Sequence, residues 1–108
     1  MGKPAVRPLR LRAGQAPPVL ILQNDAINRS AIRTIICAVI TSNMNQSYVP
    51  GNILLEKSVS GLDKTSVVNF SQIFTIDKTR LVGQVSMLPK QYLAKINESI
   101  RYIFNAEL

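Results

Sequence analysis

The chain has 108 residues, 46% of them hydrophobic, which is about the length of one domain and enough to bury one modest core. Lys and Arg number 13 against 6 Asp and Glu, and the formal net charge of +7 favours a polyanionic or acidic partner. Composition argues against histidine-based catalysis, an internal disulfide, a cysteine-rich zinc site and a membrane protein, because there is no histidine, one cysteine and no apolar run near ~20 residues.

Residues 1–17 are basic and rich in proline, and they show neither a helical nor an alternating apolar pattern. We expect this segment to be extended or loose, without the features of a secretory or transit signal. Its first fifteen residues carry +4 of the total +7, so the rest of the chain holds only +3. The pattern changes at Pro18, which predicts an atypical N-terminal segment over 1–17 and one folded domain over 18–108.

Short β-rich runs separated by turn signals follow in the domain. Val19–Leu22 is a continuous apolar run that ends before Asn24, the pattern of a strand buried on both faces. Cys37 lies in a second apolar run and is interpreted as a small buried hydrophobe, because a nucleophile would need a histidine partner. The other predictions are strands over Thr34–Thr41, Asn52–Leu55, Ser66–Phe70 and Leu81–Leu88, a turn over Ser58–Lys64, a bulge at Gly83, and Ser71–Ile76 as a further extended piece or the far side of a bulge.

The C-terminal part carries a helical pattern. Beyond Pro89, apolar residues recur at steps of three and four, at Tyr92, Leu93, Ile96, Ile100, Ile103 and Phe104. Pro89 suits the first turn of a helix, and charged side chains fall on the opposite side. The residues alone therefore predict a mainly β domain with one amphipathic C-terminal helix, whose apolar side serves core packing.

Several strings are more specific than this pattern, and they follow one another along the chain: PVLILQND over 18–25, AVITS over 38–42, GL at 61–62 with SVV over 66–68, and SQIFTIDKTRL over 71–81. With the terminal helix they cover 18–108 and resemble the MazF/PemK family, the toxins of type II toxin-antitoxin systems. The resemblance implies an SH3-like small β-barrel and a sequence-specific, metal-independent endoribonuclease that cuts single-stranded mRNA in the cytoplasm. It also implies a homodimer, a cognate antitoxin as partner, operator DNA bound together with that antitoxin, and no cofactor or metal.

In such enzymes the 2′-hydroxyl beside the scissile phosphate is the nucleophile, so the protein supplies proton transfer, oxyanion stabilisation and base reading. Thr41 matches the family's catalytic threonine, and a threonine chosen for its strand preference is the alternative. Ser42 and Asn43 follow in the loop where such a toxin would bind RNA, but Ser and Asn side chains also cap loops. Gln72 matches a position that contacts RNA, since an amide can read a base edge.

The charged residues within the matched strings are interpreted as structural. Asp25 would shape the turn after the first matched strand, and Asp77 with Lys78 would form a connection. Arg80 would brace the barrel through a salt bridge or hydrogen bond, although its forked donors also suit a phosphate.

The start of the chain departs from the family pattern. Members open with a Gly-Asp strand followed by an Arg-Pro pair, whereas this chain has Pro17-Pro18 and a first strand that is atypical or missing. Pro17 stands where the family has its catalytic arginine and offers no charge and no donor, a loss worth ~100-fold in rate. A catalytically silent module that binds antitoxin or nucleic acid is therefore the second hypothesis, and an SH3-like structural domain without an RNA role is the third.

Overall fold

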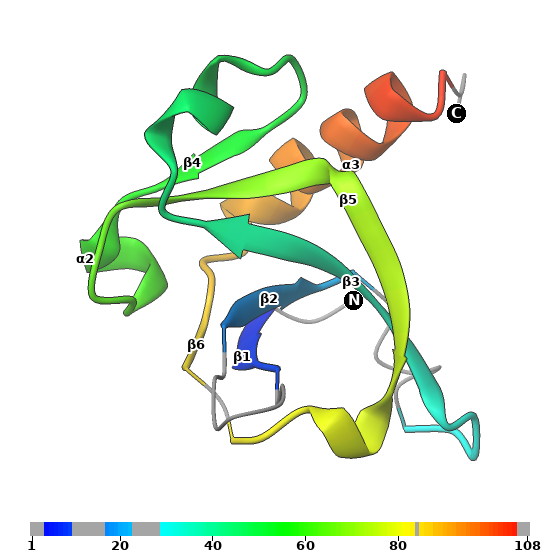
Figure 1. Cartoon of the computed structure of the whole chain (residues 1–108). Coiled ribbons are helices and arrows are strands. Elements are labelled where there is room, and N and C mark those ends of the chain that lie inside the picture. The colour runs from blue at the N-terminus through cyan, green and yellow to red at the C-terminus, as the bar shows by residue number, and fades with distance from the viewer. Residues whose placement is uncertain (1–3, 10–16, 23–28, 84, 106–108) are drawn as a thin grey trace.

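Six strands form one antiparallel sheet in the order β4-β5-β3-β2-β1-β6, and the sheet curls into a half-barrel (Figure 1). The computed structural model describes residues 4–9, 17–22, 29–83 and 85–105. The strands are β1 (Ala5–Pro8), β2 (Pro18–Ile21), β3 (Thr34–Thr41), β4 (Ile53–Leu55), β5 (Ser66–Asp77) and β6 (Ser86–Met87). The helices are η2 (Met44–Tyr48), α2 (Lys57–Ser60), η3 (Lys78–Arg80) and α3 (Gln91–Ile103). The predicted mainly β fold with a C-terminal helix is confirmed.

A first strand is present, so of the two alternatives predicted for it, atypical or missing, the second is wrong. Ala5–Pro8 lies between β2 and β6, with Val6 opposite Leu20 and Ser86. The segment is extended because proline restricts both itself and the residue before it to extended backbone. Val6 is fully buried, which explains why so short a segment is held in the sheet. Residues 5–8 thus belong to the same sheet as the domain predicted from Pro18.

Two apolar clusters lie on the two faces of the central strands. One contains Leu20 and Phe70 and is covered by α3, whose Ile96 packs into it. The other contains Val19 and Cys37. β2 therefore sends side chains into both clusters, as its continuous apolar run predicts, and the interpretation of Cys37 as a buried hydrophobe is confirmed.

The terminal helix follows the predicted apolar stripe with two differences. Lys90 is the N-cap, so Pro89 precedes the helix rather than opening its first turn. Phe104 is the C-cap and is 63% exposed, so it lies outside the core. In the described part of the chain, no helix is long and apolar enough to cross a membrane.

β5 runs continuously from Ser66 to Asp77 and carries a bulge. Ala38 on β3 is opposite Ile73, but the next residue, Val39, is opposite Asn69. Residues 70–72 of β5 therefore have no partner on β3, so both alternatives left open for residues 71–76 hold: they continue the strand and lie on the far side of a bulge.

Two predicted segments differ from the structure. Residues 58–64 are not a simple turn, since α2 occupies Lys57–Ser60 and ends at Gly61 with a φ of +74°. Leu81–Leu88 is not one strand: Leu81 makes a single bridge to Leu9, and β6 follows only at Ser86. A short helix and a divided strand both arise where tertiary contacts outweigh local preference, here through a hydrogen bond from Ser86 Oγ to Ser60 O that ties β6 to α2.

Candidate active site

Thr41 is the last residue of β3, where the chain leaves the sheet for η2. Its Oγ1 accepts a hydrogen bond from the Asn43 backbone N–H at 3.1 Å, which holds the hydroxyl in a short turn. Among the described residues, this hydroxyl has no acceptor for its own proton. Thr41 can therefore donate that proton to an oxygen of a bound phosphate.

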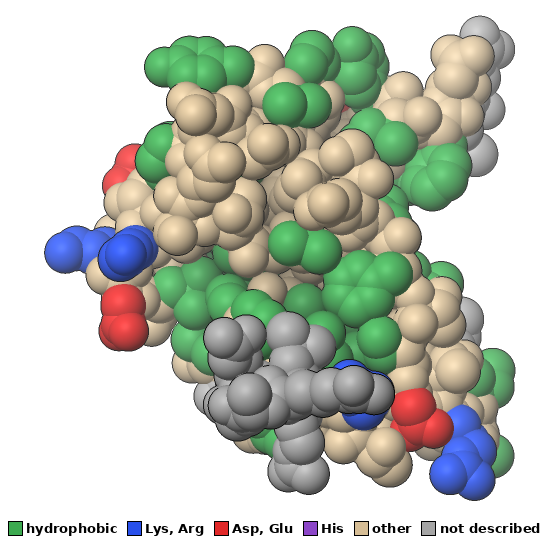
Figure 2. Space-filling view, in the orientation of Figure 1, with side chains coloured by type: hydrophobic (Ala, Val, Ile, Leu, Met, Phe, Trp, Pro, Cys, Tyr) green, Lys and Arg blue, Asp and Glu red, His purple; other side chains and the backbone are tan. Residues whose placement is uncertain are grey.

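Thr41 lies in a hollow of about 420 Å³, the Thr41 pocket. Pro17 lines the same hollow, so the position matched to the catalytic arginine lies near the threonine. Lys64 is the cation and Asp63 the carboxylate among the lining residues, and Figure 2 shows charged side chains gathered beside α2. The remaining lining residues are Pro18 of β2, Ile40 of β3, Ser42 just after β3, Leu62 after α2, and Ser66, the first residue of β5.

The two loop residues predicted to bind RNA have different surroundings. Ser42 is exposed and lines the Thr41 pocket beside Thr41. Asn43 does not line the pocket, and its Oδ1 accepts a hydrogen bond from the Asn45 N–H at 3.1 Å, which caps η2. Capping, the alternative weighed for Asn43, is thus what its side-chain oxygen does in this structure.

Gln72 lies on the bulge of β5, outside the Thr41 pocket. Its Oε1 accepts a hydrogen bond from Asn69 Nδ2 at 3.2 Å, and the same Nδ2 donates to Gln46 Oε1 at 3.4 Å. Asn69 and Gln46 are residues that sequence reasoning missed. Asn69 could have been noticed as a polar residue in the apolar run SVVNF, since a buried amide in a strand needs several partners.

The charged residues at the far end of β5 form a separate group. Asp77 Oδ1 accepts hydrogen bonds from the Thr79 N–H at 2.9 Å and the Thr79 hydroxyl at 2.8 Å, which caps η3. These bonds, with the nearby Arg33 and Arg80 charges, hold the pKa of Asp77 below its usual value. Asp77 is therefore structural, as interpreted, while Asp25 lies outside the described residues.

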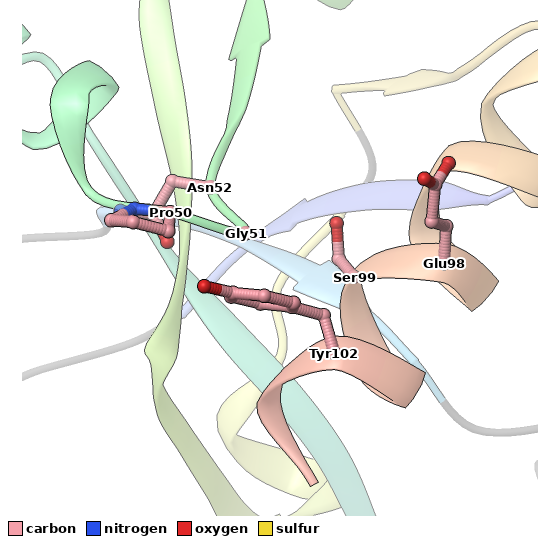
Figure 3. Close-up of a pocket in the computed structure, with 6 residues that line it drawn as sticks. All are labelled: Pro50, Gly51, Asn52, Glu98, Ser99 and Tyr102. Carbon is pink, nitrogen blue, oxygen red and sulfur yellow. The ribbon is translucent and has the colours of Figure 1, made fainter. Parts of the chain in front are cut away.

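A second hollow of about 390 Å³ is lined by the turn before β4 and by α3 (Figure 3). Pro50 and Asn52 line it from the turn, and Glu98, Ser99 and Tyr102 line it from the helix. The Tyr102 ring lies beneath the turn in Figure 3. None of the four predicted site residues lines this hollow.

The described residues offer no clustered metal ligands and one buried thiol. Within the described ranges, no three His, Cys, Asp or Glu side chains gather to hold a metal ion. Burial raises the pKa of the Cys37 thiol to about 11, so it is protonated near neutral pH and a poor nucleophile. The hydroxyl of Thr41 and the charges of Asp63 and Lys64 are polar groups that this pocket brings together.

Comparison with known proteins agrees with this geometry. A sequence profile described as "PemK-like, MazF-like toxin of type II toxin-antitoxin system" matches residues 10–104. Endoribonuclease MazF6 of Mycobacterium tuberculosis is 36% identical over 88 residues, covering 82% of this chain and 77% of that protein. Endoribonuclease MazF of Staphylococcus saprophyticus is 38% identical over 87 residues, covering 81% and 72%.

Solved structures give the same fold. The Mycobacterium tuberculosis toxin MazF-mt6 superposes with a TM-score of 0.84 at 23% identity, covering 96% of this chain and 99% of that one. An endoribonuclease in complex with its cognate antitoxin, from a mycobacterial species, superposes with a TM-score of 0.76 at 23% identity, covering 96% and 92%. The chain therefore belongs to the PemK-like and MazF-like family of type II toxin-antitoxin toxins, whose curated relatives are endoribonucleases.

Proposed function

We propose that this chain cleaves single-stranded RNA at short sequence motifs, without a metal ion, and that Thr41 is its catalytic hydroxyl. The observation that carries the proposal is the placement of Thr41, which lines a pocket together with a lysine and a carboxylate. Ser42 lines the same pocket and is proposed to contact RNA. The 36% identity to an endoribonuclease supports the reaction type.

The reaction needs no protein nucleophile. The 2′-oxygen of the ribose attacks the adjacent phosphorus as its hydroxyl proton is removed, and the bond from phosphorus to the 5′-oxygen breaks as that oxygen gains a proton. Negative charge grows on the non-bridging oxygens, where a positioned hydrogen-bond donor lowers the barrier. The Thr41 hydroxyl suits this role because its oxygen is already engaged by the Asn43 N–H and its proton is not.

Cleavage of a long single-stranded RNA in EDTA tests the proposal. The unmodified chain should give discrete fragments, Thr41→Ala should slow cleavage by ~100-fold, and Thr41→Ser should retain most of the rate because it keeps the donor. Equal cleavage rates for all three chains would show that Thr41 has no catalytic role. Uncut RNA at high protein concentration would show that the unmodified chain is not an active endoribonuclease.

A silent binding module is the second candidate, and Pro17 in the Thr41 pocket is the observation in its favour. It predicts capture of an antitoxin without growth arrest when the chain is expressed alone. The endoribonuclease relatives weigh against it. Growth arrest relieved by Thr41→Ala would exclude it.

We further propose a cognate antitoxin, operator DNA bound with that antitoxin, a homodimer and a cytoplasmic setting. The solved complex of a relative with its antitoxin supports the first partner. An apolar hollow lined by Leu22, Ile36, Ile73, Ile100 and Phe104 offers a surface for a second copy. Figure 2 shows apolar side chains over the β3–β5 crossing and the end of α3. Light scattering of the pure chain should give twice its 11.9 kDa mass, and a monomer would exclude the homodimer.

A further inference from the structure

Four amide side chains, Gln46, Asn52, Asn69 and Gln72, form one hydrogen-bonded group, the amide cluster. Asn52 anchors it. Asn52 Oδ1 accepts from the Phe70 backbone N–H at 3.0 Å, and its Nδ2 donates to the Gln46 backbone carbonyl at 2.9 Å. A backbone N–H can only donate and a carbonyl can only accept, so these bonds fix which end of the Asn52 amide is which.

Asn69 takes its orientation from this anchor and from the backbone. Its Oδ1 accepts from the Ser71 backbone N–H at 3.2 Å, from Ser71 Oγ at 2.6 Å and from Asn52 Nδ2 at 3.4 Å. Asn69 is only 5% exposed, so a flipped amide would leave a buried N–H₂ group facing donors. The Nδ2 of Asn69 must therefore face the glutamines.

The orientation of the Asn69 amide fixes the orientation of the Gln46 and Gln72 amides. Asn69 Nδ2 donates to Gln72 Oε1 at 3.2 Å and to Gln46 Oε1 at 3.4 Å, so both oxygens turn into the amide cluster. Their Nε2 groups are left to turn outward. Gln72 is exposed and Gln46 is half-buried, so the surface beside the bulge presents N–H donors rather than a mixture of donors and acceptors.

This donor surface lies on the same face of the sheet as Thr41. Asn69 is directly opposite Val39, and Val39 and Thr41 are alternate residues of β3. Alternate residues of a strand project to one face and lie ~7 Å apart. A base near a phosphate held at Thr41 can therefore reach Gln72.

We infer that Gln72, with Gln46 beside it, selects a base with a keto oxygen at its reading edge, uracil or guanine, over cytosine or adenine. Asn69 is the positioning residue that sets this choice. Uracil O4 and guanine O6 accept hydrogen bonds, whereas the corresponding amino groups of cytosine and adenine donate and would meet the outward Nε2 groups. This inference rests on the proposed RNA-binding function of the same face.

Binding and cleavage each test the inference. The unmodified chain should bind a ten-residue uridine oligonucleotide about 10-fold more tightly than a cytidine one in fluorescence anisotropy. Mapping cuts in a random-sequence RNA should show uracil or guanine at one position near the cut. Gln72→Glu presents an acceptor instead of a donor, because one carboxylate oxygen takes the Asn69 bond and the other faces the base, so the preference should shift to cytosine or adenine.

Two further variants complete the experiment. Gln91→Glu adds the same charge at an exposed position of α3 and should leave the preference unchanged. Asn69→Asp should turn the Nε2 groups of both glutamines inward and their oxygens outward, and so shift the base preference in the same direction as Gln72→Glu. Gln72 is exposed, so a loss of preference in Gln72→Glu cannot be attributed to unfolding of the core.

The outcomes separate cleanly. Equal affinity for the two oligonucleotides, or a cut motif unchanged by Gln72→Glu, would overturn the inference even in an active enzyme. A uniform loss across all motifs in Gln72→Met would mean that the amides contact phosphate, and would overturn base selection. Absence of cleavage together with a uridine preference lost in Gln72→Glu would reject the proposed reaction but uphold the inference.

Discussion

Pro17 contributes an apolar ring to the wall of the Thr41 pocket and no hydrogen-bond donor. Its carbonyl already accepts a hydrogen bond from the Leu9 N–H at 2.8 Å, so the residue is held beside β1. Lys64 is then the cation among the described lining residues that can approach a phosphate in this pocket. The pocket therefore carries less positive charge than it would with an arginine at position 17.

Pro17→Arg should raise the cleavage rate by at least ~10-fold, a ~1.4 kcal/mol effect on the barrier. The guanidinium would enter the pocket that Thr41 lines and add a charge-assisted contact to the developing oxyanion. Single-turnover cleavage of one RNA measures the change. Thr41→Ala in the Pro17→Arg background should abolish the gain.

Gln91→Arg is the matched control, since it adds the same charge at an exposed position of α3 outside the pocket. It should leave the rate unchanged. Equal stimulation by both substitutions would mean that the added charge acts by general attraction of RNA. No change from either would mean that the Thr41 pocket does not hold the scissile phosphate where position 17 can reach it.

Cys37 predicts a dependence of stability on alkaline pH. Burial raises the pKa of its thiol from 9.0 to about 11, with Arg7 acting weakly in the opposite direction. The unfolded chain therefore loses this proton before the folded chain does, and the stabilisation is complete below pH ~9 and falls as the pH rises towards 11. The stability difference between the unmodified chain and Cys37→Ala in urea should shrink by about 1–2 kcal/mol from pH 7.5 to 10.5. A constant difference would show that the thiol titrates normally.

At the scale of elements, the turn before β4 is fitted tightly against α3. Gly51 has a φ of +92°, and a Cβ added there would lie 3.2 Å from Ile103 Cδ1 and 3.3 Å from Tyr102 Cδ2. Figure 3 shows Tyr102 reaching under this turn. The adjoining Asn52 is bonded to the Phe70 N–H and the Gln46 carbonyl, so the turn joins the helix to the amide cluster.

Gly51→Ala should lower the free energy of unfolding by ~1–3 kcal/mol, because it combines an unfavourable φ with crowding against the helix. Gly83→Ala is the matched control, since Gly83 has a φ of +63° and nothing within 4 Å of an added Cβ. It should cost only ~1 kcal/mol. Urea unfolding measures both free energies. Equal losses in the two variants would mean that α3 moves aside for the new methyl group with no loss of stability.

At the scale of the molecule, the affinity due to charge should depend on salt concentration, whereas the preference between bases should not. The chain carries +7, but Arg7 donates to the Gly83 carbonyl at 2.8 Å, so part of the basic N-terminal segment serves the fold. If about three cations contact phosphate, binding to single-stranded RNA should weaken roughly 20-fold between 50 and 200 mM salt. Anisotropy titrations at several salt concentrations measure the slope, and an affinity independent of salt would contradict phosphate contact.

The uridine preference should change little over the same range of salt, because both oligonucleotides carry the same phosphates and differ at the base edge. A preference that vanished with salt would assign it to electrostatics.

Sequence patterns predicted the strands that carry strong local signals, such as the β-branched run of β3 and the apolar run of β2. They failed where a few residues are placed by distant partners. β1 is held by Leu20 and Ser86 rather than by its own proline-rich composition. The short α2 is tied to β6 through Ser60, a contact between segments that no local pattern reveals.

The candidate site also combines residues that local sequence patterns could predict with residues that they could not. Thr41 could be predicted as a candidate because it ends a strand within a specific string. It lines the same pocket as Pro17, and its catalytic role stays a prediction. Asn69 was missed because its importance lies in four hydrogen-bonded neighbours, of which Gln46 and Asn52 are distant in sequence and Ser71 and Gln72 lie in a bulge. Orientation of an amide is a property of a network, which residue types alone do not specify.

The place of β1 between β2 and β6 has a consequence for how this toxin is made. The strand at residues 5–8 is synthesised well before one of its neighbours, Ser86–Met87. Distant pairing of this kind forms slowly, since the intervening chain must be available before its ends can meet. We therefore expect a nascent chain to lack a completed sheet until Ser86–Met87 has been made, a delay during which the proposed antitoxin, if already present, can meet the toxin as it folds.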